Sequence, residues 1–245
     1  MNSGMYSALS GNIAAMKRLD IISNNLANVN TPGFKKDKMS FESMLNGSVN
    51  PPAVPEGSTA DPILQKDNVY IDYSQGPVAQ SGNPLDLAID GDGFFVVSTP
   101  NGQAYTRQGN FHMAADGTLV TVDGYPVMGQ GGPINVQGSK VQIDATGMVS
   151  VDGNPAGTIS IMDFPKPYNL TKEAGALFTP ADPQAAPQAA KAVLRQGYLE
   201  GSNVETISEM VQMIETNRYF EACSKVIQGY DAMASKATTD LGRLA

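Results

Sequence analysis

The sequence is poor in the residues that build disulfides and metal sites, with one cysteine, one histidine and no tryptophan. A single cysteine, Cys223, cannot form a disulfide within the chain. One histidine, His112, lying far from Cys223 in sequence predicts neither a zinc site nor a catalytic Cys-His pair. We therefore expect no cofactor, no bound metal and no enzymatic activity.

Basic residues and long apolar runs are also scarce. The chain has 16 Lys and Arg against 24 Asp and Glu, a formal net charge of -8. Nucleic-acid binders need clustered Lys and Arg, so this balance predicts no nucleic-acid partner. No run of about 18 apolar residues is present, so we expect no stable membrane insertion. The N-terminus lacks a basic start followed by an apolar stretch, so we expect either a cytoplasmic chain or export without cleavage.

Near the N-terminus, apolar residues recur at intervals of three and four, which predicts an amphipathic helix with a stripe close to a coiled-coil seam. The stripe consists of Met5, Leu9, Asn12, Met16, Leu19, Ser23 and Leu26, broadened by Ile13 and Ile22. Asn28, Asn30 and Pro32 predict the end of the helix. Thr31-Pro32-Gly33 then predicts a tight turn.

A second long helix is predicted at the other end of the chain, where Ser202 and Glu205 match a capping box. Its stripe consists of Val204, Ile207, Val211, Ile214, Ala222, Val226, Tyr230, Met233, Ala237, Leu241 and Leu244, interrupted at Arg218. Roughly 40 helical residues would span about 60 Å, too long for the core of this chain. Either the two helices pack together or on partners, or both pack on their own β-rich domain.

Between the helices the pattern is that of a turn-rich β protein. Short β runs are predicted at 85–89, 94–98, 103–107, 118–122, 140–143, 148–151 and 158–164. Hairpin turn pairs lie between them: Asp92-Gly93, Asn101-Gly102, Asp116-Gly117, Asp123-Gly124 and Asp152-Gly153. The fold class is therefore mainly β with long terminal α-helices. We expect a helix and turn at 1–35, an irregular connector at 36–80, a β-rich domain at 81–178, a linker and return strand at 179–200, and a helix at 201–245.

Two charged groups have structural and functional interpretations. Asp86, Asp90 and Asp92 resemble an acid/base pair or a cation loop, but an EF-hand loop starting at Asp90 would need Glu where Asn101 stands. Carboxylates of ordinary turns are the better interpretation. Lys35, Lys36 and Lys38 form a basic run that could touch anionic lipid during export, although a solvated patch is favoured because acidic residues dilute it.

Several motifs resemble those of the bacterial flagellar rod and hook family. They are Ser23–Lys35, Gly82–Phe95, Tyr105–Phe111, Leu119–Val127, and Gly201–Val204 continuing through Arg218-Tyr219. The short middle and Gly131-Gly132-Pro133-Ile134 favour the proximal-rod branch of this family over the distal-rod branch, which shares the motifs.

The resemblance implies a structural subunit that is exported uncleaved through the flagellar type III apparatus. It also implies helical polymerisation with copies of itself and other rod proteins, in which paired terminal helices form the inner tube wall. By that resemblance, the assembly residues would be Leu9, Ile13, Met16, Leu19, Asn24, Asn25, Leu26, Asn28, Thr31, Pro32, Gly33 and Phe34, with Val204, Ile207, Val211, Ile214, Arg218, Tyr219, Val226 and Met233. Phe41 and Leu45 are similar to the family's export-gate element. A secreted β-rich binding module and a hydrolase using the Asp cluster are the alternatives.

Overall fold

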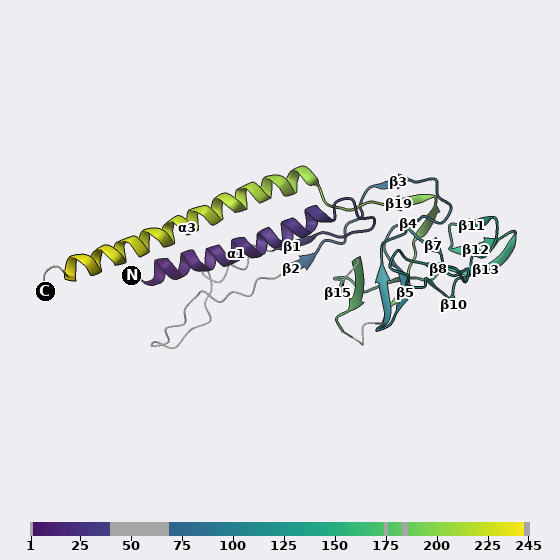
Figure 1. Cartoon of the computed structure of the whole chain (residues 1–245). Coiled ribbons are helices and arrows are strands. Elements are labelled where there is room, and N and C mark those ends of the chain that lie inside the picture. The colour runs from purple at the N-terminus through teal and green to yellow at the C-terminus, as the bar shows by residue number, and fades with distance from the viewer. Residues whose placement is uncertain (1, 40–68, 174–175, 183–185, 243–245) are drawn as a thin grey trace. The chain divides into compact units, whose positions relative to one another are not determined.

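The computed structural model describes residues 2–39, 69–173, 176–182 and 186–242 (Figure 1). These residues form two compact units. The helical unit contains the described residues of 1–27, 36–72 and 205–245, and the β-rich unit contains those of 28–35 and 73–204. Long helices near both ends and a β-rich middle confirm the predicted fold class. Residues 28–35, which we expected to group with the first helix, belong to the β-rich unit.

The helical unit consists of α1 (Asn2–Ala27), α3 (Thr206–Gly242) and the short strands β1 (Asp37–Met39) and β2 (Val69–Ile71). The helices run antiparallel and side by side (Figure 1). Two hydrogen bonds show the direction: Asn12 donates to Ser224, and Arg18, further along α1, donates to Gln212, which comes earlier in α3. With 26 and 37 residues, the helices are about 39 Å and 56 Å long. The last turns of α3 therefore extend beyond the start of α1.

A row of small residues on α1 makes the contact with α3. Its members, spaced alternately by four and three, are Gly4, Ala8, Gly11 and Ala15. A Cβ at Gly4 would lie 2.3 Å from the hydroxyl oxygen of Tyr230, and one at Gly11 would lie 2.8 Å from that of Tyr219. Because these glycines have no side chain, the two tyrosines can reach the backbone of α1. We call this contact the small-residue seam.

The predicted apolar stripe of α1 is not the face that packs on α3. Each member of the seam precedes a member of the predicted stripe by one residue, which corresponds to about 100° of rotation. Accordingly Met5, Leu9, Ile13 and Met16 are exposed, whereas Asn12, Leu19 and Leu26 are half-buried at the edge of the contact. Ile22 alone among the larger apolar residues of the prediction is fully buried.

The start of α3 also differs from the prediction. The hydroxyl of Ser202 accepts from the backbone N–H of Val204 (3.3 Å), and the first helical bond runs from the N–H of Glu209 to the carbonyl of Glu205 (3.0 Å). Ser202 therefore closes a local turn, the helix begins at Thr206, and the predicted capping box is wrong. Val204 precedes the helix and is buried in the β-rich unit.

The largest sheet of the β-rich unit has six antiparallel strands in the order β15-β16-β6-β5-β14-β17. Its central strands, β5 (Phe94–Thr99) and β6 (Gly102–Thr106), pair from Phe95 opposite Thr106 to Thr99 opposite Gly102. The sheet is completed by β14 (Ile161–Asp163), β15 (Leu170–Glu173), β16 (Leu177–Pro180) and β17 (Gln188–Ala189). The smaller ladders are β11 (Val141–Ile143) with β12 (Met148–Val151) and β13 (Asn154–Thr158), β18 (Val193–Gln196) with β4 (Leu87–Asp90), β19 (Tyr198–Glu200) with β3 (Val78–Gln80), β7 (His112–Met113) with β8 (Leu119–Val120), and β10 (Gly132–Pro133) with β9 (Met128–Gly129).

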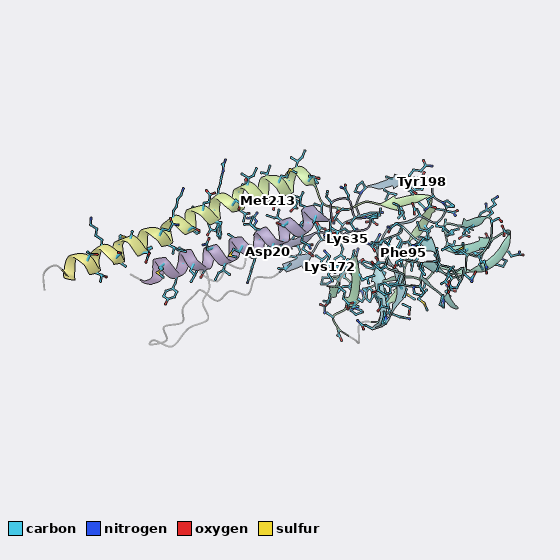
Figure 2. The ribbon with its side chains drawn as sticks, in the orientation of Figure 1. Asp20, Lys35, Phe95, Lys172, Tyr198 and Met213 are labelled. Carbon is cyan, nitrogen blue, oxygen red and sulfur yellow. The ribbon has the colours of Figure 1, made fainter. Side chains whose placement is uncertain are left out.

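Strand β5 is buried on both faces, because successive side chains point to opposite sides of the sheet. Phe95, labelled in Figure 2, and Val97 belong to the main hydrophobic core. Phe94 instead joins a cluster of aromatic rings, with ring centroids 5.6 Å from Phe178 and 6.1 Å from Tyr73. The two sets of contacts explain why the sequence of β5 reads as an unbroken apolar run.

Three of the predicted turn pairs lie at the turns of hairpins: Asn101-Gly102 between β5 and β6, Asp116-Gly117 between β7 and β8, and Asp152-Gly153 between β12 and β13. Asp92-Gly93 instead connects β4 to β5, which do not pair with each other. Asp152 (φ 51°) and Gly153 (φ 86°) connect β12 to β13 as a two-residue turn with positive φ at both positions. The predicted connector at 36–80 was wrong in part, since its described residues contain β1, β2 and β3. Strands β15 and β16 were missed altogether. Partners distant in sequence hold most of these strands, as β19 holds β3, and a local pattern does not show such partners.

Candidate assembly surface

The exposed side of α1 carries a row of large apolar side chains next to the small-residue seam. It consists of Met5, Leu9, Ile13 and Met16, which are 44–55% exposed. Figure 2 shows side chains projecting along both helices of the helical unit. Large apolar side chains gathered on one exposed face mark a contact surface.

The exposed side of α3 carries a second apolar row, confined to the first turns of the helix. Its members are Ile207, Met210, Val211 and Ile214, of which Ile207 is 81% exposed; Val226 and Met233 are also exposed but lie on a different side of the helix. Ile207, Val211 and Ile214 lie on the side of α3 opposite the buried Thr216 and Cys223, given 100° per residue. The hydroxyl of Thr216 donates to the carbonyl of Gln212 (2.6 Å), which satisfies a polar group inside the contact with α1. We refer to these two sets of exposed apolar side chains, one on α1 and one on α3, together as the apolar rows.

Asn25, a predicted assembly residue, is instead buried within its own unit. Its side-chain oxygen accepts from the backbone N–H of Asp37 (3.0 Å), and its amide donates to the carbonyl of Asp37 (2.9 Å) and to the carboxylate of Glu209 (3.4 Å). The amide thereby ties the end of α1 to the start of β1 and to α3. Arg218 and Asn24 are exposed, while Tyr219 is half-exposed and reaches the seam. Burial, followed by the hydrogen bond with Cys223, raises the pKa of Tyr219.

The turn after α1 belongs to the core of the β-rich unit. The N–H of Thr31 donates to the carbonyl of Asn28 (3.1 Å), and Gly33 adopts φ +67°. Phe34 is buried with Val204 and Ala176, so its side chain packs inside the β-rich unit, and its role in assembly stays a prediction. Pro32 is half-buried.

Lys35 was predicted to lie in a solvated patch, and this was wrong. Its ammonium group is buried, donating to the carboxylate of Glu200 (2.5 Å) and to the carbonyl of Ser74 (2.8 Å). The other carboxylate oxygen of Glu200 accepts from Arg107 (3.1 Å), and all three side chains are at most 4% exposed. The ammonium group of Lys172 donates to the carbonyl of Lys35 (2.8 Å), and both lysines are labelled in Figure 2.

We call Lys35, Arg107 and Glu200 the buried ion triad. Sequence reasoning missed it because the three residues lie in separate motifs and come together only through the fold. One indication that Lys35 is buried was present in the sequence: in Gly33-Phe34-Lys35 the charged residue lies within a motif and directly follows an aromatic residue. The neighbouring Lys38 is a surface residue, where the hydrogen bond with Asp72 raises its pKa.

The three acidic residues near β4 each have a different polar partner. Asp86 accepts from Asn83 (3.0 Å), Asp90 from Arg195 (2.5 Å), and Asp92 from Lys166 (2.7 Å). No group of three Cys, His, Asp or Glu side chains that could hold a metal ion occurs within the described part of the chain. His112 lies on the exposed strand β7. Phe41 and Leu45, the export-gate candidates, lie outside the described residues.

Three family models match the chain. Residues 5–35 match the flagella basal body rod protein, residues 88–151 the flagellar hook protein FlgE/F/G D1 domain, and residues 195–240 the flagellar basal body rod FlgEFG protein C-terminal region. Over 247 aligned residues the chain is 33% identical to the flagellar basal-body rod protein FlgF of Rhizobium meliloti, covering 99% of both chains. The chain belongs to the flagellar basal-body rod protein family.

Other relatives come from both rod branches. The rod protein is 30% identical over 246 residues to FlgF of Mesorhizobium japonicum, with 99% of each chain covered. It is 34% identical over 259 residues to FlgG of Bacillus subtilis, with 94% of this chain and 96% of the relative covered. The rod protein is a structural component of the flagellar basal-body rod and acts in motility with other rod and flagellar components. None of its described helices is apolar over a length that would cross a membrane.

Proposed function

We propose that this chain is a subunit of the proximal rod, which polymerises helically through the apolar rows of α1 and α3. One observation carries the proposal. The small-residue seam joins α1 to α3 within the chain, and the large apolar residues of both helices are left exposed. A surface of this kind gains free energy only when another molecule covers it.

The proximal rather than the distal rod is supported by the lengths of the relatives. The FlgF relatives align over 99% of both chains in 246 and 247 residues, whereas the FlgG relative needs 259. The distal rod is the second candidate, because FlgG relatives reach 35% identity. Mass spectrometry of purified hook–basal bodies separates them: a few copies per particle support the proximal rod, and a much larger number supports the distal rod.

The remaining parts of the proposal concern export and catalysis. We propose passage through the flagellar type III export apparatus, with Phe41 and Leu45 as the residues that engage it. We also propose a purely structural role. It is supported by the separate pairing of Asp86, Asp90 and Asp92, which leaves no shared carboxylate pair in the described residues around β4.

Substitution of Ile214 by Asp tests the role of the apolar rows. Ile214 is 54% exposed, so Ile214→Asp should leave the monomer folded and change its free energy of unfolding by less than about 1 kcal/mol. In the assembled rod, Asp would forfeit about 1 kcal/mol of apolar burial per contact and place a charge in an apolar interface at a cost of several kcal/mol. We expect a deletion strain carrying this variant to be non-motile.

The matched control is Ser208→Asp, which introduces the same charge at an exposed position of α3 about 120° around the helix from Ile214. This control should restore motility, as should Ile214→Leu. Circular dichroism of the purified variants checks that the helices remain formed. Full motility with Ile214→Asp would show that the apolar rows do not carry assembly.

A further inference from the structure

We propose that the β-rich unit contains a binding pocket for a carboxylate, with Arg107 and Lys166 as the groups that hold it. The pocket has a volume of about 330 Å³, and its lining includes Gln75, Gly91, Asp92, Arg107 and Lys166. It lies beside the buried ion triad, which it shares through Arg107. The proposal goes beyond assembly and concerns a site apart from the apolar rows.

Arg107 is the group that points to an anionic ligand. Its side chain is 4% exposed, and its two terminal nitrogens donate to Glu200 (3.1 Å) and to the carbonyl of Gly91 (2.7 Å). Its Nε is buried and has no hydrogen-bond partner among the described residues. A buried donor left unpaired destabilises the fold, more so when it is charged, so a ligand that accepts from it is favoured.

The charge of Arg107 is also only partly balanced. The single carboxylate of Glu200 is shared between Arg107, Lys35 and the backbone N–H of Gly76. The other bond of Arg107 goes to an uncharged carbonyl. An anion in the pocket would add a second negative charge to the single one that Glu200 shares between Lys35 and Arg107. Charge-assisted hydrogen bonds are strong in such buried surroundings.

Lys166 supplies a second cation at the rim of the pocket. It pairs with Asp92 at 2.7 Å, but the two side chains are 57% and 61% exposed. An ion pair this exposed contributes little to stability, so Lys166 can exchange Asp92 for another carboxylate at small cost. Gln75, also in the lining, is fixed by its bond to the carbonyl of Ile89 (2.8 Å).

A carboxylate fits this pocket better than a larger anion because one unpaired guanidinium N–H and one ammonium group suffice for its two oxygens. Carboxylates are also the surplus charged group of this chain, with 24 Asp and Glu against 16 Lys and Arg. The ligand is therefore either a free small carboxylate or an acidic side chain of another rod subunit, and the two sources can be separated experimentally.

The first experiment measures binding by the purified full-length protein. Sodium acetate is titrated against sodium chloride of equal ionic strength, with amide chemical shifts of residues around Gln75 and Gly91 as the readout. We expect saturable shifts with acetate. Lys166→Gln should weaken binding about three- to five-fold, the value of one exposed charge. Asp92→Asn should strengthen it, because the competing carboxylate is removed. Lys140→Gln, which removes an exposed lysine outside the pocket lining, should change nothing.

Three results would overturn the proposal. The first is the absence of saturable shifts in both the wild type and Asp92→Asn. The second is a saturable response to sodium phosphate without one to acetate. The third is acetate binding that Lys166→Gln leaves unchanged, which would place the anion elsewhere.

The second experiment identifies the source and rests on the proposed assembly, whereas the first does not. Lys166→Glu and the control Lys140→Glu are each expressed in a deletion strain. Reduced motility with Lys166→Glu alone assigns the carboxylate to another subunit. Equal motility of both, together with acetate binding in solution, assigns it to a free small carboxylate.

Discussion

Removing the carboxylate of Glu200 is the sharpest test of the buried ion triad. Glu200 accepts from Lys35, Arg107 and the N–H of Gly76, and its side chain is 1% exposed. In Glu200→Gln, the two cations lose their shared counter-charge without gaining contact with water. Breaking a buried ion pair on one side costs about 3–5 kcal/mol.

This cost is large against the usual stability of a domain, about 5–15 kcal/mol. For a unit of this size it corresponds to a fall in melting temperature of about 6–20 °C. Lys35→Met should cost less, because Glu200 then keeps its bond to Arg107. The predicted order of destabilisation is therefore Glu200→Gln above Lys35→Met.

The assay is thermal and urea unfolding of the full-length protein, followed by near-ultraviolet circular dichroism of the tyrosines. The chain contains no tryptophan, so the aromatic signal comes from Tyr and Phe, including Tyr73, Tyr105 and Tyr168 of the β-rich unit. Asp90→Asn is the control, since its pair with Arg195 is about half exposed and should be worth about 1 kcal/mol or less. A loss below about 1 kcal/mol for Glu200→Gln would refute the reasoning.

The remaining predictions concern glycines. Gly33→Ala should destabilise the β-rich unit by more than about 2 kcal/mol in the same unfolding assay, because φ is +67° and the new Cβ would lie 2.3 Å from the backbone of Arg107. Gly82→Ala, with φ +78° and open space around it, should cost only about 1 kcal/mol, and an equal loss at both positions would contradict the close approach. Gly11→Leu should destabilise the helical unit by about 1–3 kcal/mol, measured by helical circular dichroism on heating, because its Cβ would lie 2.8 Å from a tyrosine hydroxyl of α3. Gly229→Leu on exposed α3 should be neutral or stabilising, and a loss of similar size there would show that the seam is not the cause.

Local pattern was enough to predict much of the fold. The turn pair Asp152-Gly153 fixes its hairpin because positive φ at both positions suits few other residues. The apolar run of β5 and the 3.6-residue periodicity of both helices are equally local properties. The sequence also carried the family motifs, which the matched family models confirm.

The charged centre of the β-rich unit needed the tertiary structure. In the sequence, Lys35 lies 72 residues before Arg107, and Arg107 lies 93 residues before Glu200. A lysine in a basic run normally lies in water. Lys35 can be buried because Glu200 of β19 pairs with its ammonium group and offsets the free energy lost when that group leaves water. The pairings of β1 with β2 and of β3 with β19 depend on the fold for the same reason.

The two helices show the division most clearly. By itself the sequence of α1 determined an amphipathic helix, but it carries two rows one residue apart, one of small residues and one of large apolar residues. Hydrophobicity alone predicted the large residues as a stripe that needs a packing partner, and left open whether that partner is α3 or another molecule. In the structure, Gly4, Ala8, Gly11 and Ala15 make the contact with α3. The hydroxyls of Tyr219 and Tyr230 reach the α1 backbone there because no large side chain lies between them. Close packing therefore selected the small row, and the large apolar side chains were left exposed for other subunits to cover.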